Sequence, residues 1–294
     1  MKTSTPPIQW YPGHIAKAEK ALITQLKRVD VVLEVRDARI PLASAHPQAS
    51  AWVGEKPRIL ILNRMDLVSA KAIEIWQCWF AAQGEVPYFT DAQHGKGISA
   101  IAKAAQATGQ ALNQRRRDRG MNPRAVRAVV IGFPNVGKSA LINRLLNRRV
   151  VESARKPGVT RQLRWVRISP DLDLLDAPGV LPPLLKDQDA AYRLAMCDDI
   201  GEGAYDRQLV ASALIQRIQE MEKYCETLGA WMPQNSLQSR YGLDLGDRMA
   251  DEYLAALAEV KFKGDVDRMA HHVLNDFRKG ILGAIPLEVP PVLA

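Results

Sequence analysis

The chain has 294 residues, of which 47% are hydrophobic and 24% are charged, the proportions of a folded protein, so wholesale disorder is excluded. No apolar run approaches the roughly 20 residues of a membrane-spanning helix, the N-terminus lacks the apolar stretch of a signal peptide, and three widely spaced cysteines exclude a disulfide framework and a CxxC metal site. A soluble, cytoplasmic protein is therefore expected, and its formal net charge of +8 is a weak indication of a polyanionic partner.

Short apolar runs alternate with helical patterns between residues 29 and 175. The expected strands are Val29–Val35, Arg58–Leu62, Val86–Phe89, Ala125–Ile131, Leu163–Ile168 and Leu172–Leu175. The expected helices between them are Ser69–Ala82, Ile98–Leu112 and Lys138–Leu146. Strands separated by helices are typical of β/α crossovers. The pattern therefore predicts an α/β fold with a mainly parallel, doubly wound sheet that is covered on both faces.

The alternation changes at two places. Asn113–Arg127 is rich in arginine, contains a glycine and a proline and has no apolar period, which predicts a solvated linker. After Pro182 the strand patterns stop, and helical periodicity follows in Asp206–Leu228, Asp247–Leu257 and Val266–Leu282. We therefore expect two domains, an α/β domain over residues 1–182 and a small all-helical domain over residues 183–294.

The segment Gly132–Ser139 matches the phosphate-loop pattern GxxxxGK followed by Ser or Thr, after an apolar strand and before a helical pattern. Backbone N–H groups of such a loop cradle phosphates at a helix N-terminus, where the helix dipole also favours negative charge. Lys138 is expected to reach the β- and γ-phosphates, and the Ser139 hydroxyl is expected to bind Mg²⁺. The residues predicted to contact the nucleotide here are Asn135, Val136, Gly137, Lys138, Ser139 and Ala140.

Asp176-Ala177-Pro178-Gly179 follows another apolar strand. DxxG is common by chance, but it is informative at the end of a strand about 40 residues after a phosphate loop. Asp176 is expected to hold Mg²⁺ through water, and the Gly179 N–H is expected to meet the γ-phosphate. Between the two motifs, Thr160 lies in an expected flexible loop. Its hydroxyl would complete the Mg²⁺ shell while a γ-phosphate is present and leave it afterwards, which makes this loop a switch.

Asn63-Arg64-Met65-Asp66 ends a further strand and matches a loosened NKxD pattern. The Asp66 carboxylate would accept hydrogen bonds from guanine N1–H and the 2-amino group, two donors that adenine lacks. Asn63 is expected to bind the base edge and to brace the phosphate loop. Arg64 replaces the usual lysine, and its planar guanidinium is expected to lie over the base. These motifs predict GTP as the nucleotide; a small-molecule ATPase or kinase that uses the same loop is the alternative.

The base-reading motif precedes the phosphate loop by about 70 residues, which reverses the order of ordinary GTPases. A parallel sheet with exposed ends can be cut and rejoined elsewhere, because chain termini often lie close together. This motif order resembles the circularly permuted GTPases, and most closely the YlqF/RbgA family of ribosome-biogenesis GTPases. The resemblance is carried by Trp10–Ala18, Asp37–Pro41, Asn63–Asp66, Gly132–Ser139, Pro157–Thr160 and Asp176–Gly179.

The resemblance implies a circularly permuted P-loop GTPase that hydrolyses GTP to GDP in late maturation of the large ribosomal subunit. Its implied partners are the precursor of that subunit and its ribosomal RNA, on which the helical tail would help to dock, and the chain would act as a monomer. The resemblance also implies a second base contact at Thr90, Asp91 and Ala92, a K⁺ ion near Asn135 and Mg²⁺ at the phosphates.

Many GTPases orient the attacking water with a glutamine just after DxxG, but here that residue is Val180, whose side chain forms no hydrogen bonds. His14, in a Pro-Gly-His turn that the resemblance marks as functional, is the candidate that would orient the water, with Lys138 at the phosphates. A K⁺ ion at Asn135 would stand in for an arginine finger. Activation by a ribosomal partner is equally compatible with these residues.

A basic block covers residues 144–167, with eight Lys or Arg residues against one acid. Because it flanks the expected switch loop, it predicts an RNA-backbone footprint that responds to the nucleotide, with a solvated charged face as the alternative. The absence of a glutamine after DxxG leaves a second function open. In that case the protein is a nucleotide-gated RNA-binding module with negligible hydrolysis.

Overall fold

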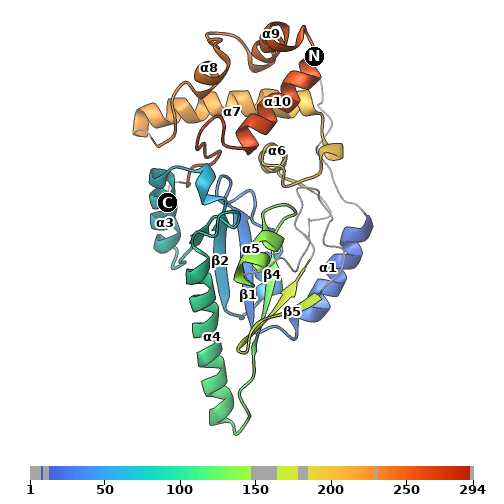
Figure 1. The fold of residues 1–294 in the computed structure, drawn as a ribbon, viewed down its shortest axis with the longest axis vertical. Helices are drawn as coiled ribbons and strands as arrows, with labels where there is room; N and C mark the ends of the chain where they lie inside the picture. The colour runs from blue at the N-terminus through green and yellow to red at the C-terminus, as the bar shows by residue number, and fades with distance from the viewer. Residues whose placement is uncertain (1–7, 9–12, 147–163, 178–184, 229–230, 292–294) are drawn as a thin grey trace.

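The computed structural model describes residues 8, 13–146, 164–177, 185–228 and 231–291, and its centre is a six-stranded sheet (Figure 1). The strands are β1 (Val31–Asp37), β2 (Arg58–Asn63), β3 (Tyr88–Thr90), β4 (Val126–Ile131), β5 (Arg164–Ser169) and β6 (Leu172–Asp176). Their order is β3-β2-β1-β4-β6-β5, and every neighbouring pair is parallel except β5 and β6. The predicted mainly parallel sheet is confirmed.

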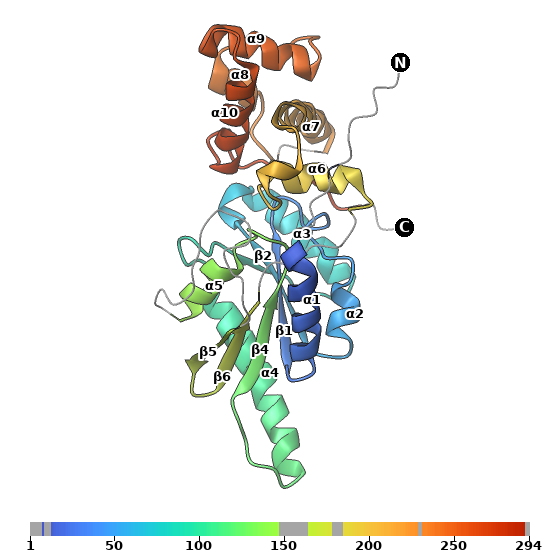
Figure 2. The same ribbon diagram turned by 90° about the vertical axis from the view of Figure 1, so that its right-hand side faces the viewer.

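Helices cover both faces of this sheet. They are α1 (Gly13–Leu26), α2 (Ala49–Val53), α3 (Ala70–Ala82), α4 (Ile98–Asp118) and α5 (Lys138–Leu145). α1 packs beside α2 and α4 packs beside α5, and Figure 2 shows these two pairs on opposite sides of the strands. All seven residues of β1 are buried. A strand covered on both faces reads as a near-continuous apolar run, which explains the Val-Val-Leu start of β1.

The parallel register gathers the carboxyl ends of the strands at one edge of the sheet. Asp37 at the end of β1 pairs with Asn63 at the end of β2, and Asn63 pairs with Thr90 at the end of β3. On the other side of β1, Val130 near the end of β4 pairs with Asp176 at the end of β6. Ligands of open α/β sheets bind at this carboxyl edge. The edge therefore collects residues from the base-reading motif, the second base contact and the DxxG motif.

The chain from residue 188 onward is helical wherever the structure describes an element. The helices are α6 (Gln188–Met196), α7 (Arg207–Leu228), α8 (Ser236–Tyr241), α9 (Ala250–Phe262) and α10 (Val266–Arg278). α7 contacts α6, α9 and α10, and Met269, Val273 and Phe277 of α10 are buried. Among the described helices, none combines the length and apolar character that a membrane crossing requires.

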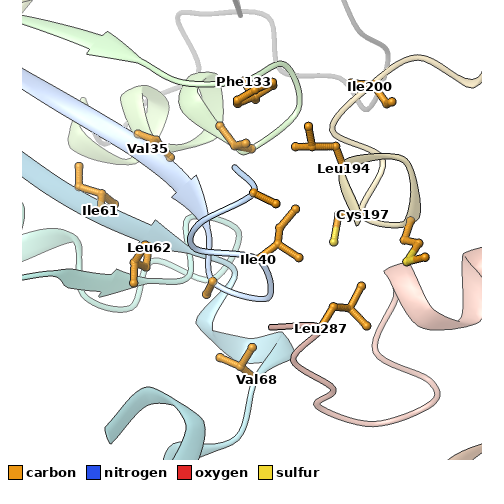
Figure 3. Packing of buried hydrophobic residues seen from close by; sticks show 14 of the residues in the cluster. Val35, Ile40, Ile61, Leu62, Val68, Phe133, Leu194, Cys197, Ile200 and Leu287 are labelled. Atoms are coloured by element: carbon orange, nitrogen blue, oxygen red, sulfur yellow. The ribbon is translucent and has the colours of Figure 1, made fainter. Parts of the chain in front are cut away.

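These helices lie over the carboxyl edge of the sheet, and a continuous apolar core joins them to it (Figure 3). Val35 of β1 and Phe133 of the phosphate loop belong to the same buried cluster as Leu194 of α6 and Leu287 of the C-terminal segment. The buried Glu288 carboxylate accepts hydrogen bonds from the backbone N–H groups of residues 42 and 43, at 2.8 and 2.9 Å. The C-terminal segment therefore fastens the helices to the loop that follows β1.

The structure departs from the sequence prediction in its helices. α1, α2, α6 and α8 were not predicted, and α4 continues to Asp118 where a linker was expected from Asn113. The linker prediction is therefore wrong for residues 113–118. Their sequence, NQRRRD, has no apolar period because this end of α4 has no core to cover. Glutamine and arginine still have a high helix propensity.

Candidate nucleotide-binding site

The phosphate loop connects β4 to α5 through backbone conformations that favour glycine. Gly132 has φ 147° and Gly137 has φ 100°. A Cβ atom on Gly132 would lie 2.2 Å from the Val35 carbonyl oxygen, and one on Gly137 would lie 2.1 Å from Asn63 Nδ2. Both positions therefore exclude a side chain, because the loop runs directly against β1 and the end of β2.

Lys138 lies within this loop at the start of α5. Its side chain is buried, and Nζ donates to the carbonyl oxygens of Phe133 at 2.6 Å and Gly132 at 3.2 Å. Ser139 and Ala140 follow in the first turn of α5. A lysine enclosed by the loop, next to the N-terminus of a helix, is an arrangement that suits an anion such as a phosphate.

Asn63 joins the three loops at the carboxyl edge of the sheet. Its Nδ2 donates to the carbonyl oxygen of Val136 in the phosphate loop, at 2.8 Å. Its Oδ1 accepts from Thr90 Oγ1 at 3.1 Å and from the Ala92 N–H at 3.0 Å. Asn63 therefore braces the phosphate loop, as expected from the sequence, and it also fixes the loop in which the second base contact was predicted.

Two carboxylates and an imidazole lie beside this brace. Ligand atoms of Asp66, Asp91 and His94 all lie within 4.8 Å of one another. The Asp91 carboxylate accepts from the N–H groups of residues 93 and 94 and contacts His94 Nδ1 at 2.7 Å. Loss of hydration raises the pKa of Asp66, and the negative charge of Asp91 raises it further. The carboxylate predicted to read guanine is thus harder to ionise than an ordinary aspartate.

This environment predicts a pH dependence of guanine-nucleotide binding. Only ionised Asp66 accepts both guanine donors, so affinity is present above its raised pKa and is lost as the pH falls through that value. We expect this loss to begin at a higher pH than an ordinary aspartate, with its pKa of 3.8, would give. Asp91→Asn removes the neighbouring charge and is expected to move the loss to lower pH. Titrations with fluorescent GDP from pH 4.5 to 8 measure this pH dependence, and circular dichroism verifies folding. Coincident affinity profiles for the wild type and Asp91→Asn would contradict the prediction.

Arg64 forms hydrogen bonds with three parts of the fold. Its guanidinium donates to Asp37 Oδ2 at 2.7 Å and to the carbonyl oxygens of Cys197 at 3.0 Å and Asn135 at 2.6 Å. Three acceptors from β1, the end of α6 and the phosphate loop therefore fix this side chain. In the structure it links the base-reading loop to the phosphate loop and to the helices, and its position over the base stays a prediction.

Asp37 and Arg39 form a buried ion pair at the same junction. Arg39 Nε and Nη2 donate to the two oxygens of Asp37 at 3.0 and 2.7 Å, and Nη2 also donates to the Cys197 carbonyl at 3.1 Å. Burial alone would raise the pKa of Asp37, but the guanidinium groups of Arg39 and Arg64 hold it below the ordinary value. Sequence reasoning missed this pair as a structural element, although a strand ending in Asp-x-Arg was a usable signal.

The loop after α6 completes the junction. Asn135 Nδ2, in the phosphate loop, donates to the Asp198 carbonyl at 2.7 Å. The next residue, Asp199, is fully buried, and Arg64 Nη1 lies 3.6 Å from its Oδ1. Burial raises the pKa of Asp199 well above its ordinary value. The helices thus contact the phosphate loop and the base-reading loop through polar groups that the sequence did not single out.

Several predicted site residues lie outside the described part of the chain. Thr160, Gly179, Val180 and most of the basic block 144–167 belong to this group, and so do the side chains of His14, in the first turn of α1, and Asp176. The backbone of Asp176 nevertheless ends β6 beside Val130 of β4. Ser139 and Asp176 offer hydroxyl and carboxylate oxygens, the ligand types that Mg²⁺ prefers, so the residue set fits that ion.

The fold and the site together define a class of protein. A phosphate loop between β4 and α5, joined by Asn63 to a base-reading loop that comes earlier in the chain, is the arrangement of a circularly permuted P-loop GTPase. In agreement, the family model described as 50S ribosome-binding GTPase matches residues 127–229. The chain is 34% identical to Ribosome biogenesis GTPase A of Bacillus cereus, over 96% of this chain and 94% of that protein. The chain therefore belongs to the Ribosome biogenesis GTPase A family.

Other comparisons agree with this assignment. Mitochondrial ribosome-associated GTPase 1 of Xenopus tropicalis is 31% identical over 95% of this chain and 94% of that protein. A crystal structure of GNP-bound YlqF from T. maritima gives a TM-score of 0.62 at 21% identity, over 94% of this chain and 100% of that one. This likeness shows the shared fold. The family resemblance expected from the sequence is confirmed.

Proposed function

We propose that this protein is an assembly factor in late maturation of the large ribosomal subunit that binds ribosomal RNA and hydrolyses GTP to GDP and phosphate. The observation that supports it most is the Asn63 brace, because it holds the base-reading loop against the phosphate loop. The names of the relatives, Ribosome biogenesis GTPase A and Mitochondrial ribosome-associated GTPase 1, point to the ribosome. We further propose that the protein acts as a monomer in the cytoplasm.

Guanine recognition is assigned to Asp66, with Asn63 and the loop of Thr90, Asp91 and Ala92 shaping the pocket around the base. Adenine would leave the Asp66 carboxylate without a donor, which costs binding free energy. The phosphates are assigned to the backbone N–H groups of the phosphate loop and to Lys138, whose ammonium group already lies among the loop carbonyls. The residues that would hold Mg²⁺ are Ser139, Asp176 and Thr160; the bound ion would neutralise charge on the β- and γ-phosphate oxygens.

Hydrolysis is assigned to a water that His14 orients toward the γ-phosphate, since Val180 cannot do so. Asn135 is the residue that would hold a K⁺ ion near the phosphates. The Gly179 N–H would sense the γ-phosphate. With no glutamine in the usual place, intrinsic turnover is expected to be slow, and binding to the ribosomal precursor would complete the site.

The contacts between the helices and the site support a division of labour along the chain. We assign nucleotide binding to residues 1–182 and RNA docking to the helical residues 183–294. Asn135 and Arg64 contact the loop after α6 directly, at 2.7 to 3.0 Å. A change in the phosphate loop on exchange of GTP for GDP would therefore reach α6 without an intermediate element.

The decisive test is the rate of GTP hydrolysis with and without large-subunit precursors, at low and at high K⁺. Precursors are expected to raise the rate by about tenfold or more, because a partner that completes a GTPase site has effects of this size or larger. His14→Ala is expected to abolish the stimulated rate while leaving GTP affinity unchanged. Negligible turnover with precursors, unchanged in His14→Ala, would favour the nucleotide-gated RNA-binding module. Tighter binding of ATP than of GTP would contradict the GTPase and favour the small-molecule ATPase or kinase.

A further inference from the structure

The second half of α4 projects beyond the sheet. At Gly109 the helix still packs closely against the sheet, because a Cβ atom there would lie 2.2 Å from Cγ2 of Val126, the first residue of β4. The helix continues to Asp118, which adds roughly 13 Å at about 1.5 Å per residue. Figures 1 and 2 both show this end of α4 protruding at the end of the molecule opposite the helices α6–α10.

The protruding end has a defined shape. Asn113 donates to the carbonyl of Arg124 at 2.9 Å and accepts from its N–H at 3.0 Å, so it clamps the returning chain against α4. Arg124 in turn forms two hydrogen bonds with Asp30, at 2.7 and 2.8 Å. Within the loop, Arg116 Nε donates to the Asn122 carbonyl at 3.0 Å. We call residues 114–123, beyond the Asn113 clamp, the α4 tip.

The α4 tip carries an unbalanced positive charge. Its charged residues are Arg115, Arg116, Arg117, Asp118 and Arg119. The single acid accepts a hydrogen bond from Gln114 at 2.9 Å, and among the described residues none of the four arginines has a carboxylate within 4.0 Å. Arg124, below the tip, is by contrast neutralised by Asp30. Arg116 and Arg117 each donate one hydrogen bond to a neutral oxygen, of the Asn122 carbonyl and of the Gln114 side chain, which leaves their charge uncompensated. The positive charge of the four guanidinium groups is therefore available to an external anion.

The arginines surround the helix end. At about 100° per residue, Arg115, Arg116 and Arg119 fall within an arc of about 100°, while Arg117 points to the opposite side. A flat acidic surface would contact only one of these sides. A tip that is basic on both sides can instead contact the two rows of phosphates that border a groove, and double-stranded RNA is recognised mainly through its shape and its phosphates rather than its base edges. Arginine also suits phosphate because its planar fork of N–H donors matches phosphate oxygens.

We infer that the α4 tip is an RNA-binding surface that contacts the phosphate backbones of double-stranded RNA and binds it without reading its sequence. The inference rests on the proposed function, because ribosomal RNA is the polyanion that function supplies. It adds a contact at the end of the molecule farthest from α6–α10, so that RNA can be held at both ends of the protein. The arginine-rich segment Asn113–Arg127, which the sequence predicts to be a solvated linker, would then contribute to RNA binding.

The test replaces the four arginines by glutamine, which keeps helix propensity, and measures binding to a 20-base-pair RNA duplex across a salt series. We expect affinity at 100 mM salt to fall by about tenfold or more, and the slope of log affinity against log salt to become shallower by about 2–4, since each phosphate contact contributes about 0.9 in duplex DNA. The four-lysine replacement should keep most of the slope. Intrinsic GTP hydrolysis should stay at the wild-type rate in every variant.

A matched control removes four charges elsewhere, from Lys20, Lys56, Lys71 and Lys103, of which the last lies on α4 itself. An equal loss of RNA affinity in this control would overturn the inference, since net charge alone would then explain binding. Unchanged affinity of the glutamine variant for the RNA duplex would overturn the inference too. So would a wild-type protein whose four arginines bind poly-glutamate but not RNA. Failure of the proposed function is read separately, from the absence of stimulation of wild-type hydrolysis by large-subunit precursors.

Discussion

Asp66→Asn is expected to lower the affinity for guanine nucleotides by about 10³-fold and to raise the affinity for xanthine nucleotides. The substitution replaces one carboxylate oxygen by an amide nitrogen, so the two guanine donors face a side chain that accepts only one of them. Xanthine carries a carbonyl at C2 in place of the amino group, and this oxygen can accept from the new amide. The nucleotide preference should therefore change without any change in the phosphate loop.

Competition of GDP, XDP and ADP against a fluorescent guanine nucleotide measures this preference. Asp91→Asn is the matched control, because Asp91 lies within 4.8 Å of Asp66 and is already occupied by two backbone N–H groups and His94. That variant is expected to keep the preference for guanine. If Asp66→Asn also bound GDP as tightly as the wild type, the assignment of Asp66 to the base would have to be abandoned.

The parts of the site that the sequence predicts are those whose residues lie close together in the chain. Gly132–Ser139 carries its own glycines, lysine and hydroxyl, and Asn63 and Asp66 lie within one short loop at the end of a strand. A parallel sheet then brings the two loops together, because the carboxyl ends of neighbouring strands meet at one edge. The Asn63 hydrogen bond to Val136 spans 73 residues, yet it follows from this rule alone.

The polar junction with the helices follows from no such rule. Arg39 and Cys197 are 158 residues apart, and their contact uses a backbone carbonyl, which leaves no mark in the sequence. The direction of Arg64 depends on the same carbonyl and on a buried aspartate of β1, and its motif predicted neither contact. The end of α4 was not predicted as helix for another reason, since a helix that covers no core shows no apolar period.

Arg39→Met is expected to destabilise the protein by about 3–5 kcal/mol, because it leaves the fully buried Asp37 carboxylate without its bidentate partner. Among the residues that the structure describes, Arg64 would remain as the only cation paired with Asp37, and its side chain is about a quarter exposed (23%), so solvent weakens that pair. The Cys197 carbonyl would lose one of its two donors as well. The double variant Asp37→Asn, Arg39→Met removes both charges and is expected to recover part of the loss, since a buried pair costs most when only one partner is removed.

Urea unfolding of the full chain, followed by circular dichroism, measures these differences. Lys71→Met is the control for loss of a positive charge, because its pair with Glu74 is exposed on both sides, and no measurable change is expected there. A loss below about 1 kcal/mol in Arg39→Met would mean that Arg64 alone compensates Asp37. If the double variant is less stable than Arg39→Met, the neutral amide introduced at position 37 fails to form the hydrogen bonds of the carboxylate. The junction would then be held by hydrogen-bond geometry rather than by charge balance. This junction is the direct polar contact between the phosphate loop and the end of α6. The more stable of the two variants should therefore also be used to measure whether GTP binding still changes the conformation of the helices.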